Sequence, residues 1–235
     1  MNPNEKIKQI IGDKNNYIVG FANLEGLITN KFGNYVYGIV IGRKLDDRII
    51  DSIESGPTLE YYQHYKDVNR ELSEMVHHIS NELNKVSIST MIVEPTLSDD
   101  ALDEYYYRTL RADFSHKMAG TRAGLGWIGK TDLFVSEKFG PRLRLATVLT
   151  NHPLDCSVAP IDESRCGECN LCVKKCPAKA ATGKSWNIHI EREEFFDPFK
   201  CREMCLELCS ERMNQRVSIC GICVSVCPRG KAQKQ

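Results

Sequence analysis

The cysteines of this 235-residue chain are confined to one part of it. All 11 lie between Cys156 and Cys227, so the first 155 residues contain none. An odd number of thiols cannot pair completely, and disulfide frameworks are typical of short secreted chains. The first residues, MNPNEKIKQII, lack a basic segment followed by a long apolar one. We therefore expect a cytoplasmic protein whose clustered, reduced thiols bind metal.

The overall charge and hydrophobicity argue against nucleic acid and membrane as partners. Lys and Arg total 31, Asp and Glu also total 31, and 42% of the residues are hydrophobic. A chain with zero net charge offers no generally basic surface for nucleic acid. No apolar run reaches the roughly 18 residues of a membrane span. We expect a globular chain that does not enter the membrane.

Two cysteine motifs predict two iron–sulfur clusters. The first is Cys166-x2-Cys169-x2-Cys172-x3-Cys176-Pro177, the spacing of two-cluster ferredoxins, in which the fourth cysteine binds the other cluster. A second copy, with one ligand fewer, is Cys220-x2-Cys223-x3-Cys227-Pro228. We therefore assign cluster 1 to Cys166, Cys169, Cys172 and Cys227, and cluster 2 to Cys176, Cys201, Cys220 and Cys223.

The upstream ligand of cluster 2 has two candidates. Cys201, Cys205 and Cys209 recur every fourth residue and share one face of a predicted helix. We favour Cys201 because it is nearest the helix start, where free N–H groups stabilise a thiolate, and Cys205 is the alternative. Structural zinc is disfavoured because it does not use the third thiol or the Cys-Pro exit. The three remaining cysteines are expected to be structural.

The cysteine-free part has the pattern of a mixed α/β domain, either α/β or α+β. Apolar and β-branched residues predict strands over 16–23, 35–42, 87–93 and 143–149. Apolar residues at steps of three and four predict a long helix over 58–85. We place the domain boundary in 151–164. The expected domains are 1–155, which holds a cofactor, and 156–235, a small ferredoxin-like domain with two [4Fe–4S] clusters.

The segment from Gly124 to Thr131, GLGWIGKT, matches the letters of a phosphate-binding loop. Its surroundings do not fit that function, because no apolar strand precedes it and a short strand and turn follow it. An ATP-driven reductive activator using Lys130 and Thr131 is therefore a minor hypothesis. We expect the glycines to allow close approach of the backbone to another element or to a flat ligand.

The same segment and both cysteine motifs carry a resemblance to a known family. The stretches ADFSHKMAGTRAGLGWIGKTDLFVSEKFGPRLRLATVLTNHPL, SRCGECNLCVKKCPAKAATGKSW and ICGICVSVCPRG resemble the epoxyqueuosine reductases, especially short relatives with a double [4Fe–4S] domain. The resemblance implies a corrinoid-binding, nitroreductase-like N-terminal domain with one cluster beside the corrinoid. In that family, reduced cobalt removes an epoxide oxygen from a modified tRNA nucleoside. Reductive dehalogenases share the layout.

The resemblance also suggests individual site residues. It supports the eight cluster cysteines and implies a cofactor-facing loop, whose residues are Gly124, Gly126, Gly129 and Lys130. The family's proton donor is an Asp in a Val-Asp-Thr-Gly stretch, which this chain lacks. Asp113 is the nearest candidate acid, with His116 or Lys117 as substitutes. The chain also ends eight residues after Cys227, without the helical repeats that help longer enzymes hold tRNA, so tRNA is disfavoured as a partner.

Two function classes follow from these observations. The leading hypothesis is an oxidoreductase that takes electrons from a low-potential donor of ferredoxin or flavodoxin type. The two clusters would pass these electrons to a cobalamin-type cofactor or a substrate in the N-terminal domain. The alternative is an electron-transfer or adaptor protein that performs no chemistry of its own. The substrate and the oligomeric state do not follow from the sequence.

Overall fold

Four of the predicted strands pair into one sheet in the computed structural model, which describes residues 2–98 and 101–231. The strand order is β1 (Tyr17–Asn23), β2 (Tyr37–Lys44), β6 (Leu143–Thr150) and β3 (Thr90–Val93). β1 is antiparallel to β2, and β3 is antiparallel to β6. The four expected strands are therefore confirmed, and the mixed α/β class is confirmed with them.

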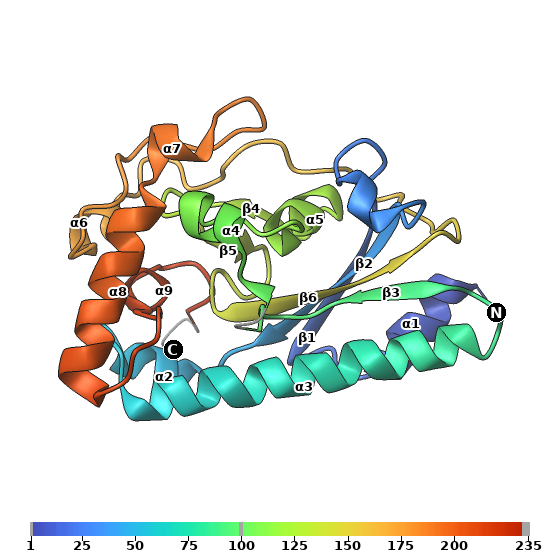
Figure 1. Cartoon of the computed structure of the whole chain (residues 1–235), viewed down its shortest axis with the longest axis horizontal. Helices are drawn as coiled ribbons and strands as arrows, with labels where there is room; N and C mark the ends of the chain where they lie inside the picture. The colour runs from blue at the N-terminus through green and yellow to red at the C-terminus, as the bar shows by residue number, and fades with distance from the viewer. Residues whose placement is uncertain (1, 99–100, 232–235) are drawn as a thin grey trace. The chain divides into compact units, whose positions relative to one another are not determined.

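The long helix predicted over 58–85 is also confirmed, as α3 (Leu59–Asn84). Over its C-terminal two thirds, α3 runs along one face of the sheet (Figure 1). The buried side chains of this part recur at helical spacing and are Val68, Leu72, Val76, Ile79 and Leu83. Helix α5 (His116–Arg122) packs on β1 and β2, and α1 (Pro3–Ile11) packs on β1. Apolar periodicity thus accounts for the main layers.

The chain divides into two compact units, and neither is continuous in sequence. Unit 1 consists of residues 1–44, 68–125 and 144–161, and unit 2 consists of residues 45–67, 126–143 and 162–235. Unit 1 therefore contains the sheet, with η1 (Asn30–Phe32) and α4 (Glu104–Thr109) on its connections. Two early segments belong to the same unit as the cysteine motifs. The sequential division into 1–155 and 156–235 differs from the observed units in this respect.

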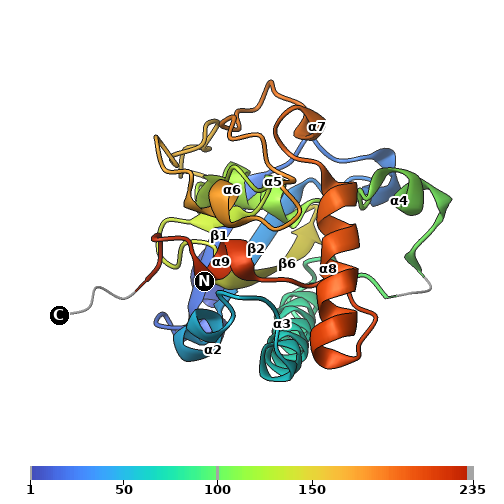
Figure 2. The ribbon, with the colours of Figure 1, turned by 90° about the vertical axis from the view of Figure 1, so that its left-hand side faces the viewer.

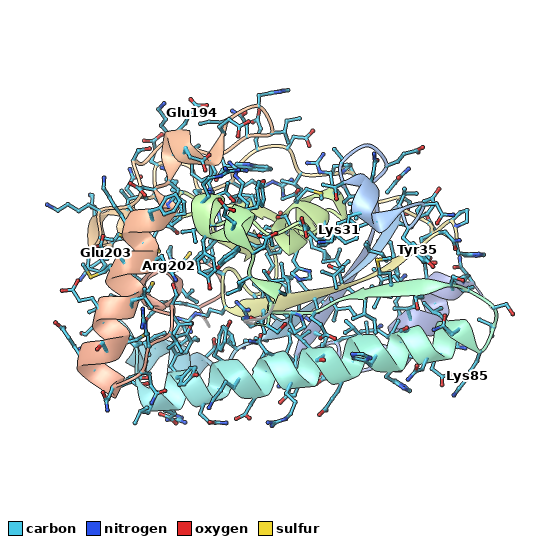
Figure 3. The ribbon with its side chains drawn as sticks, in the orientation of Figure 1. Lys31, Tyr35, Lys85, Glu194, Arg202 and Glu203 are labelled. Carbon is cyan, nitrogen blue, oxygen red and sulfur yellow. The ribbon has the colours of Figure 1, made fainter. Side chains whose placement is uncertain are left out.

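Unit 2 brings its short elements around the cysteine motifs. Strands β4 (Gly126–Ile128) and β5 (Phe134–Ser136) form an antiparallel hairpin. Helix α6 (Leu171–Lys175) follows the first cysteines and lies beside α9 (Ile222–Ser225), which belongs to the second motif (Figure 2). Helix α2 (Asp47–Ser52) also packs against α9. The remaining helices are α7 (Arg192–Phe195) and α8 (Pro198–Met213), whose exposed faces carry Glu194 and Glu203 (Figure 3).

A buried arginine connects three segments of unit 2. The side chain of Arg142 is 1% exposed. Its guanidinium donates to Asp47 Oδ1 at 3.0 Å, to Asp51 Oδ1 at 2.5 Å and to the Ser225 carbonyl at 3.4 Å. A charge removed from water must be compensated in this way, because desolvation costs several kcal/mol. Arg142 therefore fixes α2 beside the end of α9.

None of the helices among the described residues is long and apolar enough to cross a membrane.

Candidate metal centre

The first group of thiols comes from one tight loop and one distant residue. Cys166 and Cys169 lie on the loop that leads into α6, and Cys172 lies in the first turn of that helix; the Cys169 N–H donates to the Cys166 carbonyl at 3.2 Å. Cys227, from the second motif, lies beside these three. Burial raises the pKa of the Cys227 thiol to about 11; the backbone N–H of Arg229 opposes this, and the three neighbouring thiols add to it. The structure thus brings together the four residues predicted for cluster 1.

The second group of thiols contains every residue predicted for cluster 2 and one more. Burial, followed by the neighbouring sulfur atoms, raises the pKa of the Cys223 thiol. These neighbours are Cys220, Cys201 and Cys176, together with Cys172 of the first group. The additional thiol belongs to Cys205, which hydrogen-bonds with Cys201 and with Cys220. The hydrogen bond from Cys205 is the largest cause that lowers the pKa of Cys220 to about 7. Both candidate upstream ligands therefore lie beside the second motif.

The geometry of helix α8 explains why two of its cysteines are candidates for the upstream ligand of cluster 2. Asp197 caps the helix, accepting from the N–H groups of Phe199 and Lys200 at 3.1 Å each. Cys201 and Cys205 are one turn apart on the same face. Cys209, a further turn along, is fully buried, and its thiol donates to the Ile219 carbonyl at 2.8 Å. Cys209 therefore has a structural role in the turn that leads to Cys220.

The donors of both groups fit iron–sulfur clusters. All eleven cysteines are free thiols, and the eight that were predicted as ligands are half-buried. Among the described residues, no three His, Cys, Asp or Glu side chains converge closely enough to hold one metal ion. Four thiolates around a cube of iron and sulfide are spread more widely than four around a single ion. Groups of four or five sulfur donors from the two cysteine motifs suit [4Fe–4S] clusters.

The glycines of the GLGWIGKT segment allow a close packing of backbone against backbone. A Cβ on Gly126 would lie 2.2 Å from the Val135 carbonyl oxygen, which no side chain can tolerate. A Cβ on Gly129 would lie 3.0 Å from the Val135 side chain and 3.7 Å from Cys166 Sγ. In unit 1, Gly124 has φ +67° and its α-carbon approaches Val158 and the Ala159 carbonyl. The expectation that these glycines permit close approach to another element agrees with these contacts.

Lys130 is directed at the first cysteine loop. Its side chain is buried, and its ammonium donates to the Gly167 carbonyl and to Asn170 Oδ1, both at 2.9 Å. Gly167 and Asn170 lie inside the loop that carries Cys166 and Cys169. The next residue, Thr131, hydrogen-bonds through its hydroxyl to the Cys172 thiol. The lysine and threonine of the phosphate-loop pattern therefore contact the cysteine loop.

Trp127 contacts the same loop from the middle of β4. The side chain is 1% exposed, and its indole Nε1–H donates to Cys166 Sγ at 3.4 Å. The guanidinium carbon of Arg229 lies 5.6 Å from the indole centroid, within the range of a cation–π interaction. Arg229 also donates its backbone N–H to Cys227. A single buried indole is thus linked to two of the four thiols in the first group.

These contacts also show what the segment does not form. Phosphate-binding loops connect a strand to a helix whose first N–H groups face the ligand. Here the glycines lie in and beside the β4–β5 hairpin, and the residues that follow Thr131 lead into strand β5. The four residues expected on a corrinoid-facing loop are all packed against protein.

The two candidate catalytic residues are both engaged in unit 1. Asp113 forms an ion pair with Lys31 of η1. His116 Nε2 lies 2.9 Å from the Glu94 carbonyl, and Nδ1 lies 2.8 Å from Thr147 Oγ1. Since a carbonyl only accepts, Nε2 carries the proton and Nδ1 accepts from the threonine. Burial lowers the pKa of His116 to about 4. The ring is therefore neutral at pH 7 and supports the sheet.

Sequence reasoning missed three contributors to this site. The contacts of Trp127 with Cys166 and of Thr131 with Cys172 depend on pairings across more than 30 residues of chain, whereas Arg229 contacts Cys227, two residues before it. The available signal was the tryptophan inside a glycine-rich segment; we interpreted that segment through its glycines and lysine, and considered Thr131 only for phosphate binding. Cys205 was considered and placed second.

Comparisons with known proteins agree with this geometry. Residues 165–230 match the family described as the 4Fe-4S double cluster binding domain. Over 110 residues the chain is 34% identical to an epoxyqueuosine reductase of Lactococcus garvieae (strain Lg2), covering 47% of this chain and 30% of that enzyme. The match thus spans less than a third of that reductase. The resemblance to epoxyqueuosine reductases expected from the motifs is confirmed, as is a double 4Fe–4S segment.

Two solved structures share the fold. A reductive dehalogenase, whose structure suggests a mechanism for B12-dependent dehalogenation, has a TM-score of 0.69 and 17% identity over 97% of this chain and 32% of that one. An epoxyqueuosine reductase with an epoxyqueuosine-modified tRNA-Tyr stem loop has a TM-score of 0.59 and 16% identity. That alignment covers all of this chain and 68% of the reductase chain.

The neutral state of His116 predicts a specific pH dependence of stability. As pH falls, the unfolded chain takes up this proton near the ordinary pKa of 6.5, whereas the folded chain takes it up only near 4. The contribution of neutral His116 to the free energy of unfolding is therefore complete above pH 6.5 and is lost as pH falls towards 4. We expect a loss of about 1–3 kcal/mol over this window in anaerobic urea unfolding.

The matched control replaces a surface histidine. His116→Gln should remove that part of the pH dependence, and His152→Gln, at an exposed position, should keep it. An equal pH dependence of the free energy of unfolding in the unmodified protein and both variants would contradict the assignment of His116 as a neutral base.

Proposed function

We propose that this chain is an iron–sulfur oxidoreductase of epoxyqueuosine reductase-like type, in which two [4Fe–4S] clusters carry electrons one at a time. The observation that carries the proposal is the convergence of two separate groups of thiols in unit 2. Each group combines cysteines from both motifs, as interleaved ligation requires. The match of residues 165–230 to a double-cluster domain supports the same conclusion.

In this proposal the eight ligands are those predicted from the spacing. Cluster 1 is held by Cys166, Cys169, Cys172 and Cys227, and cluster 2 by Cys176, Cys201, Cys220 and Cys223. When bound, the clusters supply one-electron transfer at a potential set by their surroundings. The protein supplies four thiolates per cluster, keeps them half-buried, and directs N–H and O–H groups at the sulfur atoms.

The electron donor is proposed to be a low-potential carrier of ferredoxin or flavodoxin type in the cytoplasm. The acceptor is proposed to be a corrinoid, which would be reduced near unit 1. Support comes from the shared fold with a reductase and with a dehalogenase whose mechanism involves B12. Removing an epoxide oxygen as water consumes two electrons and two protons, so the donor must deliver two electrons in succession. Gly124, Gly126, Gly129 and Lys130 remain the residues proposed for the cofactor-facing loop.

The second candidate function is an electron-transfer or adaptor protein. The observation that favours it is the engagement of both candidate acids, with Asp113 paired to Lys31 and His116 held neutral. On that account no substrate reacts on this chain. A tRNA substrate stays disfavoured, as expected from the sequence, because a chain with zero net charge has no overall electrostatic attraction to a phosphate backbone.

Cobalamin binding separates the two functions. Anaerobically purified protein is titrated with cob(II)alamin and followed by its visible and EPR spectra. The oxidoreductase proposal predicts saturable binding at one equivalent, seen as a change in the visible and EPR spectra of the cobalamin. Unchanged spectra at excess cobalamin would remove the corrinoid acceptor and leave the electron-transfer function.

Substitution of single cysteines tests the ligand set of cluster 2. The variants Cys201→Ser and Cys205→Ser change residues one turn apart on α8, so they form a matched pair. The proposal predicts that Cys201→Ser loses about half of the bound iron, whereas Cys205→Ser keeps it. Iron and sulfide content and the reduced-state EPR spectrum measure this. The reverse result would move the ligand to Cys205, and full iron in both variants would show that neither thiol is required.

A further inference from the structure

The buried indole of Trp127 has one hydrogen-bond partner, and that partner is a sulfur atom. A tryptophan N–H that is taken out of water needs an acceptor. Backbone carbonyls are the usual choice, yet at 1% exposure the Nε1–H of Trp127 is directed at Cys166 Sγ, 3.4 Å away. Both residues belong to unit 2. A neutral thiol is a weak acceptor for this N–H, whereas the thiolate of a cluster ligand is a strong one.

The surroundings hold the indole in this orientation. Gly126, immediately before Trp127, lets β4 approach the β5 backbone more closely than any side chain would permit. Lys130 closes the other side of the hairpin through its two 2.9 Å hydrogen bonds to the cysteine loop. The Arg229 guanidinium covers the indole ring. The donor and the acceptor are therefore fixed independently of the bond that joins them.

We propose that Trp127 is a positioning residue that raises the reduction potential of cluster 1 through its hydrogen bond to Cys166. The inference rests on the proposed ligation of that cluster by Cys166, Cys169, Cys172 and Cys227. Reduction adds one electron to the cluster, which increases the negative charge on the ligand sulfur atoms. A fixed N–H donor stabilises the more negative, reduced form more than the oxidised form, because hydrogen bonds to charged acceptors are stronger.

Thr131 acts on the same cluster in the same direction. Its hydroxyl hydrogen-bonds to Cys172, so a second side-chain donor from the GLGWIGKT segment reaches a second ligand. At Cys220, in the other group, the donors are the Cys205 thiol and the backbone N–H of Ile222. The GLGWIGKT segment therefore supplies hydrogen-bond donors to two thiols of cluster 1.

The test is an EPR-monitored redox titration of the anaerobic holoprotein and three variants. Trp127→Phe keeps the aromatic volume and removes the N–H. Trp186→Phe is the matched control, because among the described residues the Trp186 indole donates to no thiol. Trp127→Phe should lower the equilibrium constant for reduction of cluster 1 about tenfold, which is about 59 mV for a one-electron couple. Trp186→Phe, and cluster 2 in every variant, should match the unmodified protein.

Isotope labelling identifies the affected cluster. With ¹⁵N-labelled tryptophan, the reduced-state signal of cluster 1 should show a ¹⁵N hyperfine coupling that Trp127→Phe abolishes and Trp186→Phe retains. If Trp127→Phe fails to assemble cluster 1, Thr131→Val replaces it and should also lower that potential. Assembled clusters with unchanged potential in the variant tested would overturn the inference. Absence of clusters from the unmodified protein would instead overturn the proposed function.

Discussion

The buried ammonium of Lys130 is the contact on which the cysteine loop of unit 2 depends. A lysine that is 4% exposed must replace its lost hydration, and the Gly167 carbonyl and Asn170 Oδ1 do so at 2.9 Å. These two acceptors lie between the cysteines of the first motif. The loop is therefore held against the β4–β5 hairpin by a buried ammonium group, which these two oxygens solvate in place of water. The contacts of Trp127 with Cys166 and of Thr131 with Cys172 follow from that arrangement.

The GLGWIGKT pattern has different physical functions in this chain and in a phosphate-binding loop. In such a loop, glycines expose N–H groups to an anion, and the lysine balances the charge of the phosphates. Here Gly126 faces the backbone of β5, and the lysine neutralises the partial charges of a carbonyl and an amide oxygen. The lysine and the hydroxyl residue face the cysteine loop, whose thiolates would be anionic ligands. The requirement for a cation and a hydroxyl near negative charge is common to both.

Local patterns predicted most of the fold. Runs of apolar and β-branched residues located β1, β2, β3 and β6 to within a few residues, and helical spacing located α3, because both signals arise within short segments. The cysteine spacing likewise predicted which thiols gather. The discontinuous units were not predictable, since the places of residues 45–67 and 126–143 in unit 2 depend on contacts such as Arg142 with Asp47. Trp127 was missed for the same reason, because its partner lies 39 residues away.

The central claim is that two groups of four thiolates each hold a cubane. Mössbauer spectroscopy of ⁵⁷Fe-labelled anaerobic protein, combined with iron and sulfide analysis, tests it most directly. The account predicts about eight iron and eight sulfide ions per chain, all in the quadrupole doublets of oxidised [4Fe–4S] clusters. Four irons per chain, or iron in mononuclear tetrahedral thiolate sites with no sulfide, would contradict it.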